Sequence, residues 1–379
     1  MKQARIAHLI ESDGPGGAER MLAQLAEELA AAGCPCVAFV PARGEGWLGR
    51  ALSDAGVTVE TFELGRPFSP KLANDLVVAL RRHRIDLVHS HEFSMAFYGA
   101  WAARRAGLPH VITMHGGRYY AQRLRRRLAL RMAAALSGGL VAVSEPLAAH
   151  LSRDLWIRRG RITTIANGVR FTPVPQSTLR TELRLADDEP LVLAVGNLYP
   201  VKGHSHLLDA VARLTPAHPR LHVAIAGRGE LASALERQAR QAGLGARVHF
   251  LGLRPDIPNI LAGADVFALP SLSEGLPLAL LEAMFAGRPI VASAVGDVPL
   301  ALAGGAAGVL VPAGDPIALA GAIHRVLADP GEAQRLARNA QARAAAEYGV
   351  DRMVARYAAV YERLLANGTR GMVETGGMV

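Results

Sequence analysis

The sequence predicts an α/β protein made of two doubly wound lobes, each built on a parallel sheet. Its 379 residues are enough for two domains, at about 150 residues per domain. Short runs of Val, Ile and Leu alternate with longer helical patterns, and this alternation is typical of parallel sheets. Between two such series lies a turn-rich segment, 167–190, which holds three prolines and is the expected linker.

Strands are expected where an apolar run is short and bounded by polar or turn residues. In the first lobe these runs are 6–10, 37–40, 87–89, 111–114, 140–143 and 162–165. In the second lobe they are 191–195, 221–226, 248–251, 266–269, 290–292 and 309–311. Open parallel sheets bind ligands beyond the carboxyl ends of their strands, so we expect the chemistry in the following loops, facing a cleft between the lobes.

The C-terminal part is expected to return to the first lobe. From about residue 329 to 365 the pattern is helical, and its last part places Tyr357, Val360, Tyr361 and Leu364 on one apolar face. The glycine-rich segment that follows predicts a disordered tail. The expected divisions are a first domain at 1–175, a second at 176–345, a returning helix at 346–366 and a tail at 367–379.

Composition excludes several classes of protein. Half of the residues are hydrophobic and 20% are charged, as in an ordinary globular protein. No apolar run reaches the roughly 18 residues of a membrane span. The two cysteines, Cys34 and Cys36, have no second pair at metal-ligand spacing and predict neither a disulfide framework nor a zinc site. We expect a cytoplasmic protein that binds peripherally to the inner face of the membrane.

The net charge of +9 lies wholly in the first half, where residues 1–175 carry 23 Lys and Arg against 14 Asp and Glu. No acid occurs between Glu92 and Glu145. Within this gap an apolar stripe of Leu124, Leu128, Met132 and Leu136 is accompanied by basic residues, namely Arg123, Arg125, Arg126, Arg127 and Arg131. Such a helix fits an anionic membrane carrying a lipid-linked acceptor. The alternative is a packed amphipathic helix with a solvated basic face.

A pair of carboxylates, Glu274 and Glu282, flanks a predicted helix start. Gly275 allows a tight turn, and Pro277 suits the first helical position. Glu274 is therefore expected in the loop and Glu282 on the first turns of the helix. The unpaired N–H groups of a helix start attract phosphate, and here they belong to Gly275, Leu276 and Leu278. A ribose could bind to Glu282. The alternative is a buried helix with a solvated glutamate.

Two further loops of the second lobe carry positive charge or polar groups. The chain has 39 arginines but only three lysines, so Lys202 in the loop after the strand at 191–195 indicates a need for a compact charge. Asn197 lies in the same loop, and Arg228 lies in the glycine loop after the next strand. Together with the helix start, these residues predict a diphosphate site. A solvated loop lysine is the alternative.

The first lobe offers a glycine loop and a histidine. Gly16 and Gly17, between the first strand and helix, could let a phosphate or sugar approach the backbone. His115 follows the strand at 111–114 and could hydrogen-bond the transferred sugar or the leaving phosphate. The alternative is a histidine whose bonds are satisfied inside a turn. His89, His91 and Glu92 have metal-ligand character, but Glu92 should point away from the face that the two histidines share, so no metal site is expected.

These residues together resemble the GT-B glycosyltransferases of family 4, which are retaining enzymes that use nucleoside-diphosphate sugars. The resemblance covers roughly residues 5–365. It rests on the ordered set Gly16-Gly17-Ala18-Glu19, Thr113-Met114-His115-Gly116, Val143-Ser144, Ile165-Ala166-Asn167-Gly168-Val169, the 196–203 loop, Gly227-Arg228-Gly229, Pro270-Ser271 and the 274–282 segment.

The resemblance implies a role for each candidate residue. Lys202 would contact the diphosphate, Glu282 the ribose and Glu274 the sugar hydroxyls. Gly16 or Gly17 would lie on the phosphate side, and His115 near the reaction centre. Transfer would retain the anomeric configuration and need neither a metal nor another cofactor. The implied donor is a nucleoside-diphosphate sugar, expected to be a UDP-sugar, and the implied acceptor is a glycan or a lipid-linked sugar.

One departure from the family pattern bears on activity. Asn197 stands where the family usually has arginine, which removes a positive charge beside the diphosphate, and Arg228 could compensate. Two other functions fit the sequence less well. One is a nucleotide-sugar-binding subunit that needs a partner, and the other is a nucleotide-sugar epimerase or hydrolase of the same fold. Nucleic-acid binding is disfavoured because the basic segment has no repeated aromatic stacking surface.

Overall fold

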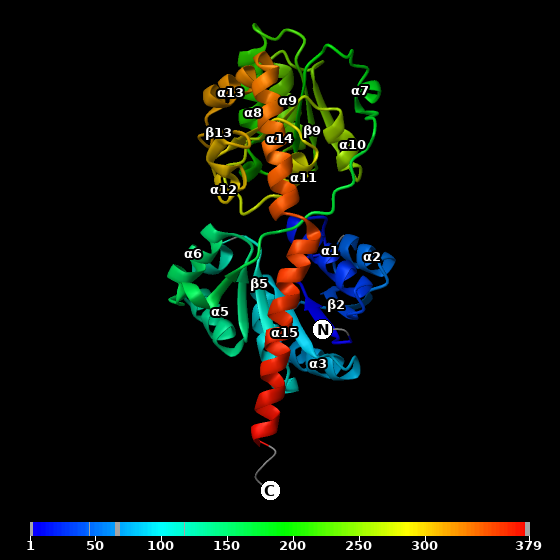
Figure 1. Ribbon diagram of the computed structural model, residues 1–379, viewed down its shortest axis with the longest axis vertical. Coiled ribbons are helices and arrows are strands. Elements are labelled where there is room, and N and C mark those ends of the chain that lie inside the picture. Colours follow the sequence, from blue (N-terminus) through cyan, green and yellow to red (C-terminus); the bar gives the residue numbers. More distant parts are fainter. Residues whose placement is uncertain (1–2, 45, 65–68, 117, 376–379) are drawn as a thin grey trace. The chain divides into compact units, whose positions relative to one another are not determined.

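The computed structural model describes residues 3–44, 46–64, 69–116 and 118–375. The chain divides into two compact units, one formed by residues 1–168 with 350–379 and the other by residues 169–349 (Figure 1). We call these unit 1 and unit 2. Each has its own parallel sheet and its own helices.

Unit 1 has a seven-stranded parallel sheet with the order β3-β2-β1-β4-β5-β6-β7. Its strands are β1 (Ile6–Leu9), β2 (Cys36–Pro41), β3 (Thr58–Phe62), β4 (Leu87–His91), β5 (His110–Met114), β6 (Gly139–Ala142) and β7 (Ile162–Thr164). Its α-helices are α1 (Gly17–Ala31), α2 (Trp47–Asp54), α3 (Pro70–Arg82), α4 (Glu92–Ala106), α5 (Leu124–Leu136), α6 (Glu145–Leu155) and α15 (Val350–Thr375). The core on one face of the sheet is formed with α1, α2 and α15, and the cores on the other face with α3, α4, α5 and α6.

Unit 2 has a six-stranded parallel sheet with the order β10-β9-β8-β11-β12-β13. Its strands are β8 (Leu191–Val195), β9 (His222–Ala226), β10 (Val248–Gly252), β11 (Val266–Leu269), β12 (Ile290–Ser293) and β13 (Val309–Val311). Its α-helices are α7 (Leu179–Glu182), α8 (His204–Leu214), α9 (Ala232–Gln241), α10 (Ile257–Ala262), α11 (Leu278–Phe285), α12 (Val298–Ala301), α13 (Pro316–Ala328) and α14 (Pro330–Glu347).

The strand order identifies the ligand-binding edge of each sheet. In unit 1 the order reverses at β1, which lies between β2 and β4, and in unit 2 it reverses at β8, which lies between β9 and β11. Ligands of open α/β sheets bind beyond the carboxyl ends of the strands at such a reversal. The loops after β1, β4, β8 and β11 are therefore the structural candidates for binding.

The apolar face predicted for the last helix is confirmed. Tyr357, Val360, Tyr361 and Leu364 of α15 are all buried in the core that α15 shares with α1. The predicted disordered tail is wrong where the structure describes it, because α15 continues to Thr375. A helix that is anchored over several turns adds further residues at little cost, since only its nucleation is expensive. Residues 376–379 of the expected tail lie outside the described residues.

Candidate active site

Three loops of unit 2 form one connected surface at the carboxyl ends of β8, β9 and β11. The backbone N–H of Leu198 donates to the carbonyl of Arg228 over 2.8 Å, which joins the loops after β8 and β9. The N–H of Leu272 donates to the carbonyl of Val201 over 2.8 Å, which joins the loops after β11 and β8. The side chains of these loops are therefore held relative to one another by backbone bonds.

Two glycines make this close approach of the loops possible. Gly203 has φ +66°, and a Cβ atom there would collide with the carbonyl oxygen of Pro270. Gly296, after β12, has φ +55°, and a Cβ atom would collide with the carbonyl of Glu274. Only glycine combines this backbone conformation with the lack of a side chain. Gly203 thus brings the Lys202 loop against the Glu274 loop.

Lys202 and Glu274 form an ion pair in this surface. Lys202 Nζ donates to Glu274 Oε1 over 2.7 Å, and the hydroxyl of Ser271 donates to the same oxygen over 2.7 Å. The Glu274 side chain is only 8% exposed, whereas that of Lys202 is 26% exposed. The ammonium group has three donors, so it can keep Glu274 and still reach an anion. Sequence reasoning had given Ser271 no role, although it belongs to the Pro270-Ser271 motif.

The predicted helix start is present as α11 but begins one residue later than predicted. Pro277 is the N-cap residue, and Leu278 is the first helical residue. Glu274 lies in the preceding loop and Glu282 lies within the helix, as expected. Gly275 is fixed at its carbonyl, which accepts a bond from Asp297 N over 2.9 Å. The N–H groups in the first turn of a helix have no acceptor within the helix, so Leu278 begins a positively polarised end. Leu276 is buried just before it.

The remaining unit 2 candidates lie in the same loops. Asn197 is half-buried and Arg228 is exposed, and both are held through the backbone bonds that join their loops. A further residue of this region, His204, contacts the carbonyl of Gly196 through Nε2 over 3.2 Å. Burial lowers the pKa of His204 to about 4, so this imidazole is neutral at neutral pH.

In unit 1, Gly16 is the N-cap residue of α1, which begins at Gly17. The carboxylate of Glu19 lies directly over Gly16, so that a Cβ atom at Gly16 would collide with Glu19 Oε2. A Cβ atom at Gly17 would meet nothing within 4 Å. Glu19 is mostly buried and brings negative charge to the helix start, which makes Gly17 the more open of the two positions for an anion.

His115 follows β5, as predicted. Its Nε2 lies 3.0 Å from Nδ1 of His91, and its backbone N–H donates to Oε1 of Glu92 over 3.1 Å. Burial lowers the pKa of His115 to about 3 and raises that of Glu92 to about 8, so both groups are neutral at neutral pH. Glu92 itself has φ +66°, a strained conformation for a residue with a side chain.

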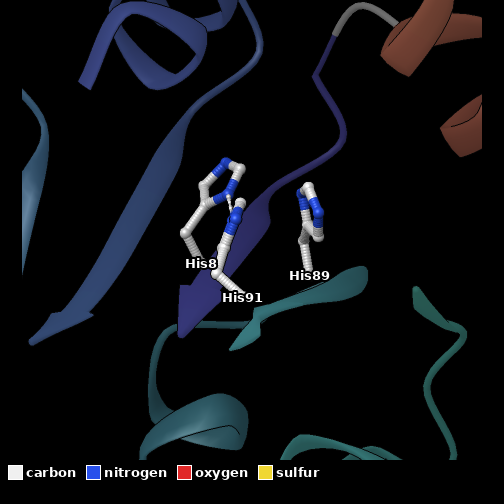
Figure 2. Close-up of side chains that lie close together, drawn as sticks. All are labelled: His8, His89 and His91. Atoms are coloured by element: carbon white, nitrogen blue, oxygen red, sulfur yellow. Dashed lines mark hydrogen bonds between the residues drawn. The ribbon is translucent and has the colours of Figure 1, made fainter. Parts of the chain in front are cut away.

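Sequence reasoning missed a histidine beside this group, His8 of β1. His8, His89 and His91 each offer one nitrogen to a set whose members all lie within 4.8 Å of one another (Figure 2). His89 and His91 do share a face, with ring centroids 4.0 Å apart. His89 already bonds through both nitrogens, to Tyr361 over 2.7 Å and to Thr113 over 2.8 Å. The absence of a metal requirement stays a prediction.

The basic segment forms α5, and its apolar stripe lies on the outside of unit 1. The helix packs inward through Leu130 and Ala133. The side chains of the stripe are 46–60% exposed and are Leu124, Leu128, Met132 and Leu136. The stripe is therefore not the face through which α5 packs, although the helix is packed. Among the described residues, no helix is both long enough and apolar enough to span a membrane.

Two arginines of α5 have structural roles. Arg127 Nε donates to the carbonyl of Asp154 over 2.7 Å, and Arg131 donates to the carbonyl of Leu155 over 2.7 Å. Both guanidinium groups also lie over the ring of Trp156, at 4.5 Å and 5.8 Å from its centroid. They attach α5 to the end of α6. Arg123 and Arg125 are exposed.

Comparison with known proteins identifies the chain's family. The model of "Glycosyltransferase Family 4" matches residues 15–172, and that of "Glycosyl transferases group 1" matches residues 175–343. A D-inositol 3-phosphate glycosyltransferase of Frankia alni is 30% identical over 368 residues, which cover 87% of this chain and 90% of the relative. The chain belongs to glycosyltransferase family 4.

Solved structures and a second relative agree with this assignment. Anabaena HepE, crystallised with UDP, has a TM-score of 0.85 and 26% identity, covering 96% of this chain and 100% of HepE. The glycosyltransferase therefore has the GT-B fold, with its two parallel sheets and flanking helices. A UDP-Gal:α-D-GlcNAc-diphosphoundecaprenol α-1,3-galactosyltransferase of Escherichia coli is 32% identical over 231 residues, which cover 56% of this chain and 59% of that relative.

Proposed function

We propose that this glycosyltransferase moves a hexosyl-type sugar from a UDP-sugar to a glycan or lipid-linked acceptor, with retention of anomeric configuration and without a metal. The observation that carries the proposal is the unit 2 surface in which the Lys202–Glu274 pair lies in loops joined by backbone bonds, with Glu274 just before the start of α11. This surface combines a cation, a carboxylate and a polarised helix end. These are the groups that a diphosphate and a sugar require.

The donor's parts are assigned to separate groups. Lys202, Arg228 and the amides at the α11 start take the diphosphate, and Asn197 gives it an uncharged hydrogen-bonding neighbour. Glu282 accepts bonds from the ribose hydroxyls, and Glu274 from the hydroxyls of the transferred sugar. Uridine is the proposed base because HepE, which shares the fold over nearly the whole chain, has been crystallised with UDP and with UDP-glucose.

The chemistry needs stabilisation of the leaving group. As the bond between the anomeric carbon and the diphosphate breaks, negative charge grows on the departing oxygen. Lys202, held by Glu274 over 2.7 Å, is already positioned for that charge, so little reorganisation is needed. The acceptor hydroxyl then attacks from the face that the diphosphate leaves, and its proton passes to the departing phosphate oxygen. The new bond has the same configuration as the old one.

Product stereochemistry tests this mechanism. An α-linked UDP-sugar is incubated with its acceptor in EDTA, and the anomeric proton of the product is followed by NMR from the earliest times. The proposal predicts that the product is α-linked and that it forms at the same rate with EDTA as without it. A β-linked product, or a strict need for added Mg²⁺ or Mn²⁺, would overturn the retaining, metal-free proposal.

The acceptor is proposed to be carried by an anionic membrane. The exposed stripe of α5 provides apolar side chains, and Arg123 and Arg125 provide charge at its start. At the other end of the helix lies a pocket of about 480 Å³ whose charged lining residues are all arginines, namely Arg131, Arg158, Arg161 and Arg363. Exposed leucines next to arginines fit the boundary between lipid tails and anionic headgroups. The name of the Escherichia coli relative includes a lipid-linked diphosphate acceptor, which supports the same class.

A further inference from the structure

Three histidines of unit 1 lie along a diagonal over three neighbouring strands. They are His8 in β1, His91 at the end of β4 and His115 directly after β5. His8 of β1 is in register with His89 of β4, and His91 lies two residues further along β4. His91 is in register with Thr113 of β5, and His115 lies two residues beyond Thr113. Alternate residues of a strand share one face, so these rings lie on the face that α1 and α15 cover.

The three rings form a hydrogen-bonded chain. His8 Nδ1 lies 3.3 Å from His91 Nε2, and the dashed line in Figure 2 marks this bond. His91 Nδ1 lies 3.0 Å from His115 Nε2. The two ends of the chain, His8 Nε2 and His115 Nδ1, are buried and have no hydrogen-bond partner among the described residues. Both nitrogens of the middle ring are thus engaged, while each outer ring has one nitrogen free.

Each ring carries a single proton. Burial lowers the pKa of His8 and His115 to about 3 and that of His91 well below its usual value of 6.5. A neutral imidazole has one N–H donor and one acceptor nitrogen. Only two arrangements of the protons then satisfy both bonds. In the first, every ring is protonated at Nδ1 and His115 Nδ1 is a free donor. In the second, every ring is protonated at Nε2 and His8 Nε2 is a free donor.

A bound ligand favours the first arrangement. The second leaves an N–H group of His8 buried beside the sheet without an acceptor, and buried N–H groups without a partner are rare in proteins. The first puts the free N–H on His115, beyond the carboxyl end of β5, where a ligand oxygen can accept it. Which nitrogen of a histidine carries the proton is set by the bond that its other nitrogen makes.

We propose that His8 and His91 are positioning residues that fix His115 as a neutral hydrogen-bond donor, with its Nδ1–H directed to an oxygen of the nucleotide sugar. The proposal rests on the proposed function and on the place near the reaction centre that the family resemblance implies for His115. His115 then stabilises charge on that oxygen by a hydrogen bond and transfers no proton. His8 and His91 act through His115 and touch no substrate.

In the described part of the protein, no ionised side chain hydrogen-bonds to the three rings. Next to the rings, Thr113 bonds to His89 and Glu92 accepts the backbone N–H of His115. Glu92, with its pKa raised to about 8, is neutral at neutral pH. On the same face, the ring centroid of His89 lies 4.0 Å from that of His91, and Tyr357 and Tyr361 of α15 pack against His89.

Two variants of His91 separate positioning from packing. His91→Leu removes the N–H that donates to His115, while His91→Gln keeps an amide donor at that place. We expect His91→Leu to lower kcat about 10- to 100-fold, by analogy with the loss of groups that orient metal-bound histidines, with little change in KM for the donor. His91→Gln should restore most of kcat. Thermal unfolding and UDP binding, both measured for each variant, show that the fold and unit 2 are intact.

The tautomer is read directly by ¹⁵N NMR of ring-labelled histidine in the protein saturated with a UDP-sugar, with His115→Gln used to assign the signals. We expect a protonated Nδ1 and an unprotonated Nε2 at His115 in the wild type, and a shift toward Nε2 protonation in His91→Leu. A proton on Nε2 of wild-type His115 would overturn the proposal. So would an equal loss of kcat in both variants with an unchanged tautomer.

Two further results distinguish the hydrogen-bonded chain from an inactive enzyme and from a metal site. A wild-type protein that turns over no nucleotide sugar contradicts the proposed function, whereas the tautomer of His115 decides the positioning chain without any turnover.

Because His8, His89 and His91 also offer nitrogens within 4.8 Å, Zn²⁺ is titrated into the labelled protein. Stoichiometric Zn²⁺ that changes the ring signals of these histidines would show a metal site and overturn the hydrogen-bonded chain. Unchanged signals support the chain.

Discussion

At the scale of single residues, the two carboxylates of unit 2 should differ in what they bind. Glu282 is assigned to the ribose, which is present in both substrate and product, whereas Glu274 is assigned to the sugar that is transferred. Glu282→Ala should therefore weaken UDP binding roughly 10- to 100-fold, the scale of losing hydrogen bonds to a charged group. Glu274→Gln, which keeps the shape of the side chain, should leave UDP affinity nearly unchanged.

Isothermal calorimetry with UDP measures both effects. Equal affinities for the wild type and Glu282→Ala would remove the ribose assignment. Unfolding curves of the two variants provide the control for folding.

Lys202 should matter most when the diphosphate leaves. Lys202→Ala is expected to lower kcat by about 10² or more, as for the loss of one preorganised donor. Lys202→Arg should recover little, because the planar guanidinium does not reproduce the 2.7 Å contact of a compact ammonium with Glu274. Steady-state kinetics at saturating donor measure this loss. An alanine variant with wild-type kcat would contradict the role of Lys202.

The sequence could place the unit 2 residues because each belongs to a local motif. Lys202 is one of only three lysines in the chain, which makes its place in a loop informative. Glu274 and Glu282 flank a helix start that Gly275 and Pro277 predict. The Lys202–Glu274 contact was not predictable, because it depends on Gly203 lying against Pro270, which is distant in sequence. His8 was missed for the same reason, since only the pairing of β1 with β4 brings it to His91.

At the scale of secondary-structure elements, apolar runs located every strand of the two sheets except β3. That strand, Thr58–Phe62, is at the edge of its sheet, and its two apolar residues, Val59 and Phe62, are separated by two polar residues. An edge strand has a neighbour on one side only and is less enclosed by protein, so it has no continuous run of Val, Ile and Leu. A search for apolar runs does not detect a strand of this composition.

Helix α5 provides the prediction at this scale. Wild-type protein should bind anionic vesicles at low salt and dissociate as salt rises. Replacing exposed Arg123 and Arg125 with Gln should weaken binding roughly 30-fold, at about 1 kcal/mol for each charge. Leu128→Gln with Met132→Gln should weaken it as well. Arg127 and Arg131 are left unchanged, because their bonds hold α5 to the end of α6.

Vesicle co-sedimentation measures this binding, with two matched controls. Arg237→Gln with Arg338→Gln removes the same charge from exposed positions of unit 2. Val78→Gln removes an apolar side chain of unit 1 that is 64% exposed. Neither control should change vesicle binding. If the α5 variants sediment like the wild type, or if anionic and neutral vesicles bind alike, the acceptor is better sought in solution.

At the scale of the whole molecule, buried histidines predict how stability depends on pH. Burial lowers the pKa of His8, His110 and His115 to about 3 and that of His204 to about 4. Unfolding returns each to about 6.5, so the unfolded chain binds more protons between these values. The stability due to the neutral rings is present above pH 6.5 and is lost as pH falls through the folded-state values.

Glu92 acts in the opposite direction. Its pKa is raised from 4.5 to about 8 in the folded state, so its contribution is present below pH 4.5 and is lost as pH rises through about 8. The melting temperature should therefore be highest near neutral pH. It should fall clearly between about pH 7 and about pH 5, where the four histidines outweigh the opposite effect of Glu92, and it should change little through Glu92 above about pH 8. Glu92→Gln removes that opposite effect, so it should make the fall below pH 7 steeper. A melting temperature constant from about pH 7 to about pH 5 would contradict neutral buried histidines.

The central claim is that unit 2 binds and activates a UDP-sugar through Lys202, Glu274 and Glu282. The most direct measurement is the release of nucleoside diphosphate from a panel of UDP-, GDP- and ADP-sugars by the full chain in EDTA. It requires no knowledge of the acceptor, because slow transfer to water also releases the diphosphate. The account predicts release from at least one UDP-sugar, faster than from the GDP- and ADP-sugars, and at least about 100-fold slower release by Lys202→Ala. Release from GDP- or ADP-sugars alone, or equal release by wild type and Lys202→Ala, would contradict it.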